Sequence, residues 1–242
     1  MSKDGDVVIV GTQGCTNGID NGYVRIYRFE NAKWTQQGQE LGGEFSESSG
    51  SSVAISRNGR RVVIVKAEDF LRYEPGNARA YEYNDIDQVW EQIEEDIQGG
   101  FNASNLSITT VDMNGDGDII ILGGPNNNDD DIDDRNEDTY YGRGNVRVYR
   151  YMEGNWIQQG QTIDGLTALD QFGSSVAISQ DGERVVIGGP TNSDNGSFSG
   201  HVRVYEFLVV NGGNGHGPTP KSKTTKAPKS AKVGKGGKKK TK

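Results

Sequence analysis

Three oxygen-bearing side chains alternate along one short segment of the chain. Asp112, Asn114 and Asp116 occupy the first, third and fifth positions of the stretch Asp-Met-Asn-Gly-Asp-Gly, whose last glycine permits a sharp turn. Alternating oxygen donors of this kind wrap a hard cation such as Ca²⁺. The usual closing ligands are missing, because the ninth position is Ile120 and the twelfth is Gly123. The segment therefore predicts either a calcium site or a plain Asp-Gly hairpin turn.

A second segment concentrates acidic side chains around one arginine. Its seven acids are Asp129, Asp130, Asp131, Asp133, Asp134, Glu137 and Asp138. Such a cluster can gather divalent cations or basic partners. A run of like charges is also typical of a solvated loop with no ligand. We interpret the segment as a loop of a binding face, with the solvated loop as the alternative.

The C-terminal end of the chain is basic and follows a Gly-rich linker at 208–220. Its ten lysines are Lys221, Lys223, Lys226, Lys229, Lys232, Lys235, Lys238, Lys239, Lys240 and Lys242. The rest of the chain then has 16 Lys and Arg against 34 Asp and Glu, a net charge of −18. Such an acidic body disfavours nucleic acid, whereas the tail suits a polyanion. Because its composition forms no core, residues 221–242 are predicted to be disordered.

The chain carries no familiar catalytic motif. It has only two histidines, His201 and His216, and neither a nucleophile elbow, a zinc-binding His-Glu-x-x-His nor a phosphate-binding loop. We therefore predict that the protein is not an enzyme. Calcium is its only candidate cofactor.

The elements that must position these residues recur about four times. The stretch Gly-x-Val-Arg-(Ile/Val)-Tyr appears at 22–27, 144–149 and 200–205, with a degenerate copy at 76–81. Each copy follows a Gly-containing turn and an apolar run, and all copies but the one at 200–205 precede a tryptophan. Four short antiparallel strands per unit, here named a to d, make a propeller blade. The repeated Arg, Tyr and Trp could form a stacking platform, but their presence in unit after unit favours packing between blades.

We predict an all-β fold, a β-propeller of four-stranded antiparallel blades with a disordered Lys-rich C-terminal tail. This chain holds about 3.5–4 blades, as an imperfect ring or as an arc of a larger propeller. Partial blades span 1–44 and 166–207, and full blades span 45–100 and 101–165. The first blade starts at strand b and the last stops at strand c. This predicts self-association or missing blades that complete the propeller. The loops between strands b and c, the acidic segment included, project from one face.

The last unit resembles the FG-GAP repeat, which is found in the propeller of integrin α-chains. The resemblance lies in Phe172-Gly173 and in Gly188-Gly189-Pro190, and Gly123-Gly124-Pro125 repeats the second half. The first two units depart from this pattern. The likeness extends over roughly residues 4–207. It implies an extracellular or cell-surface module for adhesion and recognition, with calcium in the loops between the first two strands of a blade. The segment 112–117 is similar to the start of that calcium loop.

Two functions follow as hypotheses. The first is a non-catalytic binding module that recognises a protein or glycan through loops on one acidic face, with or without calcium. The alternative is a polyanion-binding protein that holds nucleic acid, silica or polyphosphate by its Lys-rich tail, with the propeller as scaffold. No stretch approaches the roughly 18 apolar residues of a membrane span. The first six residues lack the apolar region of a signal peptide, so the compartment depends on the resemblance alone.

Overall fold

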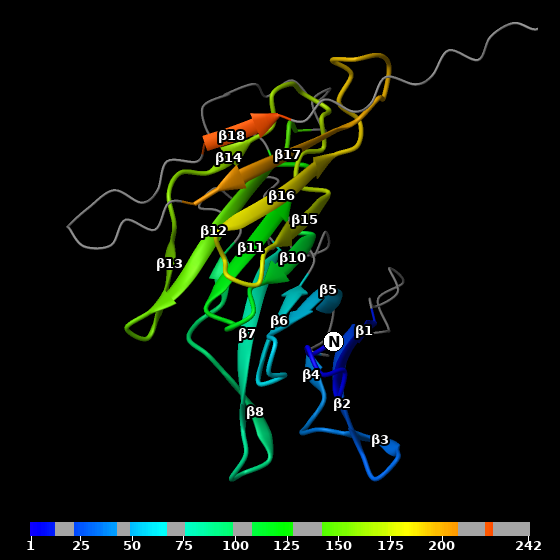
Figure 1. Ribbon diagram of the computed structural model, residues 1–242, viewed down its shortest axis with the longest axis vertical. Helices are drawn as coiled ribbons and strands as arrows, with labels where there is room; N and C mark the ends of the chain where they lie inside the picture. The colour runs from blue at the N-terminus through cyan, green and yellow to red at the C-terminus, as the bar shows by residue number, and fades with distance from the viewer. Residues whose placement is uncertain are drawn as a thin grey trace, which may run out of the picture.

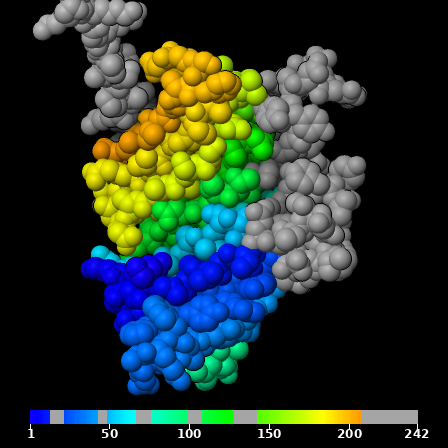
Figure 2. Space-filling model, turned by 90° about the vertical axis from the view of Figure 1, so that its right-hand side faces the viewer, coloured from blue at the N-terminus to red at the C-terminus, as the bar shows by residue number. Residues whose placement is uncertain are grey.

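The computed structural model describes residues 1–12, 22–42, 49–66, 76–98, 108–127 and 142–207, and the backbone of 221–224. These residues form strands and turns and contain no helix, so none of their segments is a candidate membrane-spanning helix. The strands form four antiparallel sheets, which we call blades 1 to 4. The blades follow one another in chain order from one end of the molecule to the other (Figure 1 and Figure 2).

Blade 1 contains β1 (Val7–Thr12), β2 (Tyr23–Glu30), β3 (Lys33–Gln36) and β4 (Leu41–Gly42). Blade 2 contains β5 (Ser49–Ile55), β6 (Arg61–Lys66), β7 (Asn77–Asn84), β8 (Val89–Gln92) and β9 (Ile97–Gln98). Blade 3 contains β10 (Thr110–Met113), β11 (Ile119–Gly124), β12 (Asn145–Met152), β13 (Asn155–Gln158) and β14 (Ile163–Asp164). Blade 4 contains β15 (Ser175–Ile178), β16 (Arg184–Gly189), β17 (His201–Glu206) and β18 (Lys221–Thr224). In blades 1 to 3 strand d is split in two, and both pieces pair with strand c.

In blades 1, 2 and 4 a serine and an asparagine or aspartate fix the turn that precedes strand b, and in blade 3 Asn114 replaces the serine. In blade 2 the Ser56 hydroxyl donates a hydrogen bond to Asn58 Oδ1 at 2.8 Å and accepts one from the Arg61 N–H at 2.9 Å. Gly59 has a φ of +70°, in the left-handed region that favours glycine, and a Cβ there would lie 2.7 Å from Val7 of blade 1. The turn thus ends one strand, starts the next and lets the neighbouring blade approach closely.

Alternation along strand b builds the cores between the blades. In β6, Val62 and Ile64 face blade 1, while Val63 and Val65 face blade 3, and each of the four is at most 1% exposed. Successive side chains of a strand point to opposite faces, so one buried strand serves two interfaces. Burial of each such side chain stabilises the fold by about 1.5–3 kcal/mol.

Two of the three repeated tryptophans, Trp90 and Trp156, lie between blades. Trp90 is 2% exposed, its ring centroid lies 5.1 Å from that of Tyr83, and its Nε1–H donates to the Gln37 carbonyl of blade 1 at 2.8 Å. Trp156 is partly buried against the core between blades 2 and 3, but its Nε1–H has no hydrogen-bond partner among the described residues. These two rings therefore pack between blades and do not form an exposed stacking platform.

Blade 4 differs from the sequence-based prediction. Strand β18 pairs antiparallel with β17, with Lys221 opposite Glu206, so the last blade does not stop at strand c. The sequence-based prediction of a disordered tail from residue 221 differs from this pairing of 221–224 with β17. An edge strand offers backbone N–H and C=O groups to any extended segment, whatever its side chains. Residues 208–220 and 225–242, with the remaining eight tail lysines, lie outside the described residues. The all-β fold of four-stranded antiparallel blades is otherwise confirmed.

Candidate functional site

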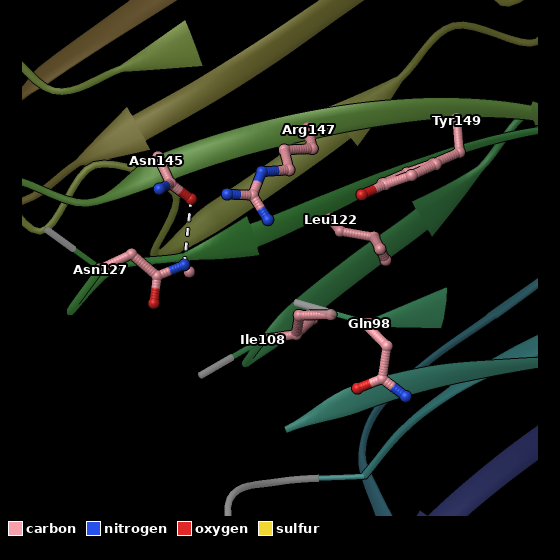
Figure 3. A pocket seen from close by; sticks show the side chains of 8 residues that line it. Gln98, Ile108, Leu122, Asn127, Asn145, Arg147 and Tyr149 are labelled. Carbon is pink, nitrogen blue, oxygen red and sulfur yellow. Dashed lines mark hydrogen bonds between the residues drawn. The ribbon is translucent and has the colours of Figure 1, made fainter. Parts of the chain in front are cut away.

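A polar hollow opens between blades 2 and 3, beside the loop that joins strands b and c of blade 3. It is small, with a cavity volume of about 10 Å³, and is lined by Gln98, Ile108, Leu122, Gly124, Asn127, Asn145, Arg147 and Tyr149 (Figure 3). Asn127 is the last described residue before the acidic segment, and the description resumes at Gly142. The amide N–H of Gly144 donates to the Asn127 carbonyl at 3.0 Å, which ties the two ends of the loop together. The hollow therefore lies at the base of the loop that carries the seven acids.

Strand β12 supplies one wall of this hollow. Asn145, Arg147 and Tyr149 are two residues apart, so their side chains lie on the same face of the strand. Arg147 stands opposite Leu122 of β11 in the sheet register, which places the apolar floor beside the polar wall. Gln98 of β9 is exposed and comes from the neighbouring blade. Two segments far apart in the sequence thus contribute polar groups to one hollow.

Hydrogen bonds hold the polar wall in place. The Asn127 side chain donates from Nδ2 to Asn145 Oδ1 at 3.0 Å, as Figure 3 shows, and both side chains are buried. Arg147 donates from Nε to Thr162 Oγ1 at 3.2 Å. Burial raises the pKa of Tyr149, and the neighbouring Arg147 opposes this. The phenol therefore remains protonated at neutral pH and can donate a hydrogen bond.

The arginine of this wall has a different partner from its equivalents in blades 1 and 2. Arg25 and Arg79 each pair with a carboxylate that directly precedes the second piece of strand d, Glu40 at 2.7 Å and Asp96 at 2.8 Å. In blade 3 the corresponding position is the neutral Thr162. A guanidinium, two amides and a phenol can bind hydroxyl, carbonyl or carboxylate groups, the groups that sugars and peptides display.

Comparison with known proteins gives the family of the last unit. Residues 163–205 match the sequence profile described as "FG-GAP repeat". The chain carries an FG-GAP repeat. The family predicted from Phe172-Gly173 and Gly188-Gly189-Pro190 is thus confirmed there. No curated protein sequence matches the chain significantly.

The chain is similar to solved structures at the level of fold. The periplasmic gluconolactonase of Pseudomonas aeruginosa aligns with a TM-score of 0.50 and 16% identity over 83% of this chain. The chain spans about half of that protein, 50% of its length. The β-propeller domain of the Trilobed protease from Pyrococcus furiosus aligns with a TM-score of 0.48 and 8% identity, over 92% of this chain and 55% of that one. The acylaminoacyl peptidase of Pyrococcus horikoshii aligns with a TM-score of 0.47 and 8% identity, over 90% and 30%.

The similarity to the gluconolactonase corrects one prediction. The absence of a familiar motif led us to predict that the protein is not an enzyme, yet the gluconolactonase with this fold is an enzyme by name. Propellers carry catalytic groups on loops from several blades, so a single-segment motif is a poor guide to them. The exclusion of catalysis therefore does not hold.

The three predicted calcium ligands make separate contacts. Asp112 accepts hydrogen bonds from the backbone N–H groups of Met113 and of Ile178 in blade 4, both at 2.9 Å. Asn114 is 2% exposed, and its side chain bonds within its own hairpin, where Oδ1 accepts a hydrogen bond from the Ile119 N–H at 2.9 Å. Asp116 is exposed. Within the described ranges, no three His, Cys, Asp or Glu side chains gather as a metal-binding group. Calcium binding by Asp112, Asn114 and Asp116 stays a prediction.

The other predicted residues lie mostly beyond the described part of the chain. The acidic segment from Asp129 to Asp138 falls wholly within 128–141, outside the described residues. Lys221 and Lys223 lie in β18, and the rest of the basic tail is outside. The sequence analysis missed the hollow, although one signal was present. The stretch Gly-Gly-Pro-x-Asn occurs twice, and its asparagines, Asn127 and Asn192, are both buried and both anchor a loop.

Proposed function

We propose that this FG-GAP propeller is a recognition module that binds a protein or a glycan at the face of the b–c loops. The observation that carries the proposal is the polar hollow at the base of the acidic loop. Its Arg147, Asn145 and Gln98 present donors and acceptors from two blades beside an apolar floor, as in ligand sites, which combine an apolar lining with a few fixed polar groups. We infer that the hollow binds one hydroxyl- or carboxylate-bearing group, and that the loop at 128–141 contacts the remainder of the ligand.

The hollow and the acidic loop would have distinct roles in binding. Because Asn127 and Gly144 close the base of the loop by a backbone hydrogen bond, the loop can differ in length and sequence without altering the wall of the hollow. The seven acids of the loop would then favour ligands with basic groups, by long-range attraction that salt weakens. Selectivity would be divided between a fixed polar hollow and a variable charged rim.

The experiment compares binding of the full chain to an array of glycans and peptides for wild type and three variants. Gln98→Ala and Arg147→Gln each remove one donor from the hollow, and each should weaken binding about tenfold, the effect of roughly 1.4 kcal/mol. Arg79→Gln is the matched control, because it makes the same change at the equivalent repeat position in blade 2. Equal weakening by Arg79→Gln, or unchanged binding in both hollow variants, would show that the ligand site lies elsewhere.

The rival function is polyanion binding by the basic tail, and it predicts a different pattern. Its specific support is the charge separation between ten tail lysines and a body of net charge −18. Binding of heparin or silica that survives all hollow variants but disappears on deletion of residues 225–242 would favour the rival. Such binding should fall steeply with salt concentration.

A further inference from the structure

The two end blades expose side chains that the inner blades bury. Val10 of β1 and Trp34 of β3 are 48% and 47% exposed, on the face of blade 1 that points away from blade 2. The equivalent residues of blade 2 are Ile64 and Trp90, which are 1% and 2% exposed because blade 1 covers them. The outer face of blade 1 is therefore built like a surface that another blade covers.

The outer face of blade 4 also exposes apolar side chains that an inner blade buries. Val186 of β16 and Val202 of β17 are 40% and 46% exposed, on the face that points away from blade 3. Their equivalents in blade 2, Val63 and Ala78, are both 0% exposed and pack against blade 3. The outer face of blade 4 is thus the kind of surface that each inner blade presents to the next.

A chain of backbone hydrogen bonds gives these faces a direction. The N–H of Lys3 donates to the Arg57 carbonyl at 2.9 Å, that of Arg57 to the Gly115 carbonyl at 2.8 Å, and that of Gly115 to the Gln180 carbonyl at 2.9 Å. These four residues hold the same place in the four turns that precede strand b. Among the described residues, the chain ends with an N–H of Gln180 that donates to no backbone group and a Lys3 carbonyl that accepts from none.

We propose that the outer faces of blades 1 and 4 dock onto each other between two copies of this chain, head to tail. The Gln180 N–H of one copy then donates to the Lys3 carbonyl of the other, and Val186 and Val202 cover Val10 and Trp34. Both the apolar match and the donor-to-acceptor match repeat what the three internal interfaces already do. Two copies that meet at both ends form a ring of eight blades, within the usual range of about 4–8 for propellers. A head-to-tail contact closes in this way when its rotation permits.

A complementation experiment tests this proposal. Sedimentation of the full chain across a dilution series should give twice the chain mass of 26.3 kDa, with dissociation at low concentration. Trp34→Glu and Val186→Glu should each give a single copy, because each variant alters both interfaces of its own ring. A mixture of the two variants should restore a pair of copies, since one of its two interfaces is then entirely wild type. Ile86→Glu is the matched control, because Ile86 is 90% exposed at a hairpin away from both faces.

Several outcomes would overturn the proposal. One is a single copy at every concentration, and another is a pair that withstands both face variants. A pair that breaks with only one variant and is not restored by mixing would indicate a contact between two identical faces instead. Loss of the pair on deletion of residues 225–242 would show that the chain's own tail, and not the contact between the outer faces of blades 1 and 4, joins the two copies. Near-ultraviolet circular dichroism shows whether each variant keeps the wild-type fold, and Val202→Glu can replace Val186→Glu if that variant does not.

Discussion

Replacement of Asp112 by alanine tests whether this residue joins blades or binds calcium. Its carboxylate links β10 of blade 3 to β15 of blade 4, because Oδ2 accepts the Ile178 N–H at 2.9 Å. Oδ1 accepts the Met113 N–H at the same distance. Asp112→Ala leaves both N–H groups without this acceptor, one of them at the junction of two blades.

The size of the loss follows from two opposing effects. A hydrogen bond to a charged group contributes about 1.5–3 kcal/mol. Burial raises the pKa of Asp112, which means that the folded state disfavours its charged form and that the variant recovers part of this cost. We expect a net loss of about 1–2 kcal/mol. For a chain of this size each kcal/mol lowers the unfolding temperature by roughly 2–4 °C, so the fall should be about 2–8 °C.

The assay is thermal unfolding of wild type, Asp112→Ala and Asp116→Ala, each with a chelator and with calcium. Asp116 is the matched control, since it lies in the same segment, is exposed and makes no hydrogen bond among the described residues. Its variant should stay within about 0.5 kcal/mol of wild type. Hydrogen exchange at the Ile178 amide should accelerate in Asp112→Ala alone. Equal losses in both variants that appear only with calcium would refute this reasoning and support the metal site.

Three further predictions concern packing, backbone and pH. Trp90→Ala should destabilise the fold by about 3–5 kcal/mol, whereas Ile86→Ala, at a 90% exposed position, should have little effect in the same denaturant titration. Gly173→Ala should lower the free energy of unfolding by more than about 1 kcal/mol, because Gly173 has a φ of +94° and a Cβ there would lie 2.8 Å from a β12 carbonyl oxygen. Gly196 also has a positive φ, but a Cβ there would have no atom within 4 Å. The difference between Gly173→Ala and Gly196→Ala in the same titration therefore measures the contribution of the clash. Burial raises the pKa of Tyr149 above its unfolded value, so the stability that the neutral phenol contributes is present below the unfolded pKa and is lost as pH rises through the folded pKa. Tyr149→Phe should therefore lose less stability than wild type between neutral and alkaline pH, and parallel unfolding curves of the two proteins would contradict this.

The blades could be predicted from the sequence because each is encoded within one short segment. The turn at Asn58-Gly59 and the run Val62–Val65 specify a hairpin by local rules alone. Repetition of the segment then implies neighbours that bury both faces of each sheet. Strand β18 follows no such rule, since its backbone pairs with β17 while its sequence, Lys-Ser-Lys-Thr, has no apolar alternation.

The hollow could not be predicted because it depends on two blades at once. Gln98 belongs to the split strand d of blade 2, and Arg147 lies 49 positions later in blade 3. Only the packing of one blade on the next brings them together. Asp112 illustrates the same limit, because its spacing to Asn114 suggests a cation loop, while its partner Ile178 is in the following blade.

The two asparagines that anchor the b–c loops show how this fold separates scaffold from recognition. Asn192 of blade 4 donates from Nδ2 to Asp170 at 2.9 Å, and its carbonyl accepts the Gly200 N–H at 2.9 Å. Asn127 plays the same part in blade 3, with Asn145 and Gly144 as partners. Each loop therefore leaves and re-enters its blade at a fixed point, and the residues between can change freely. Under our proposal, replacement of 128–141 by the shorter loop of blade 4 should preserve folding and alter which ligand is bound, whereas loss of Asn127 should disturb both.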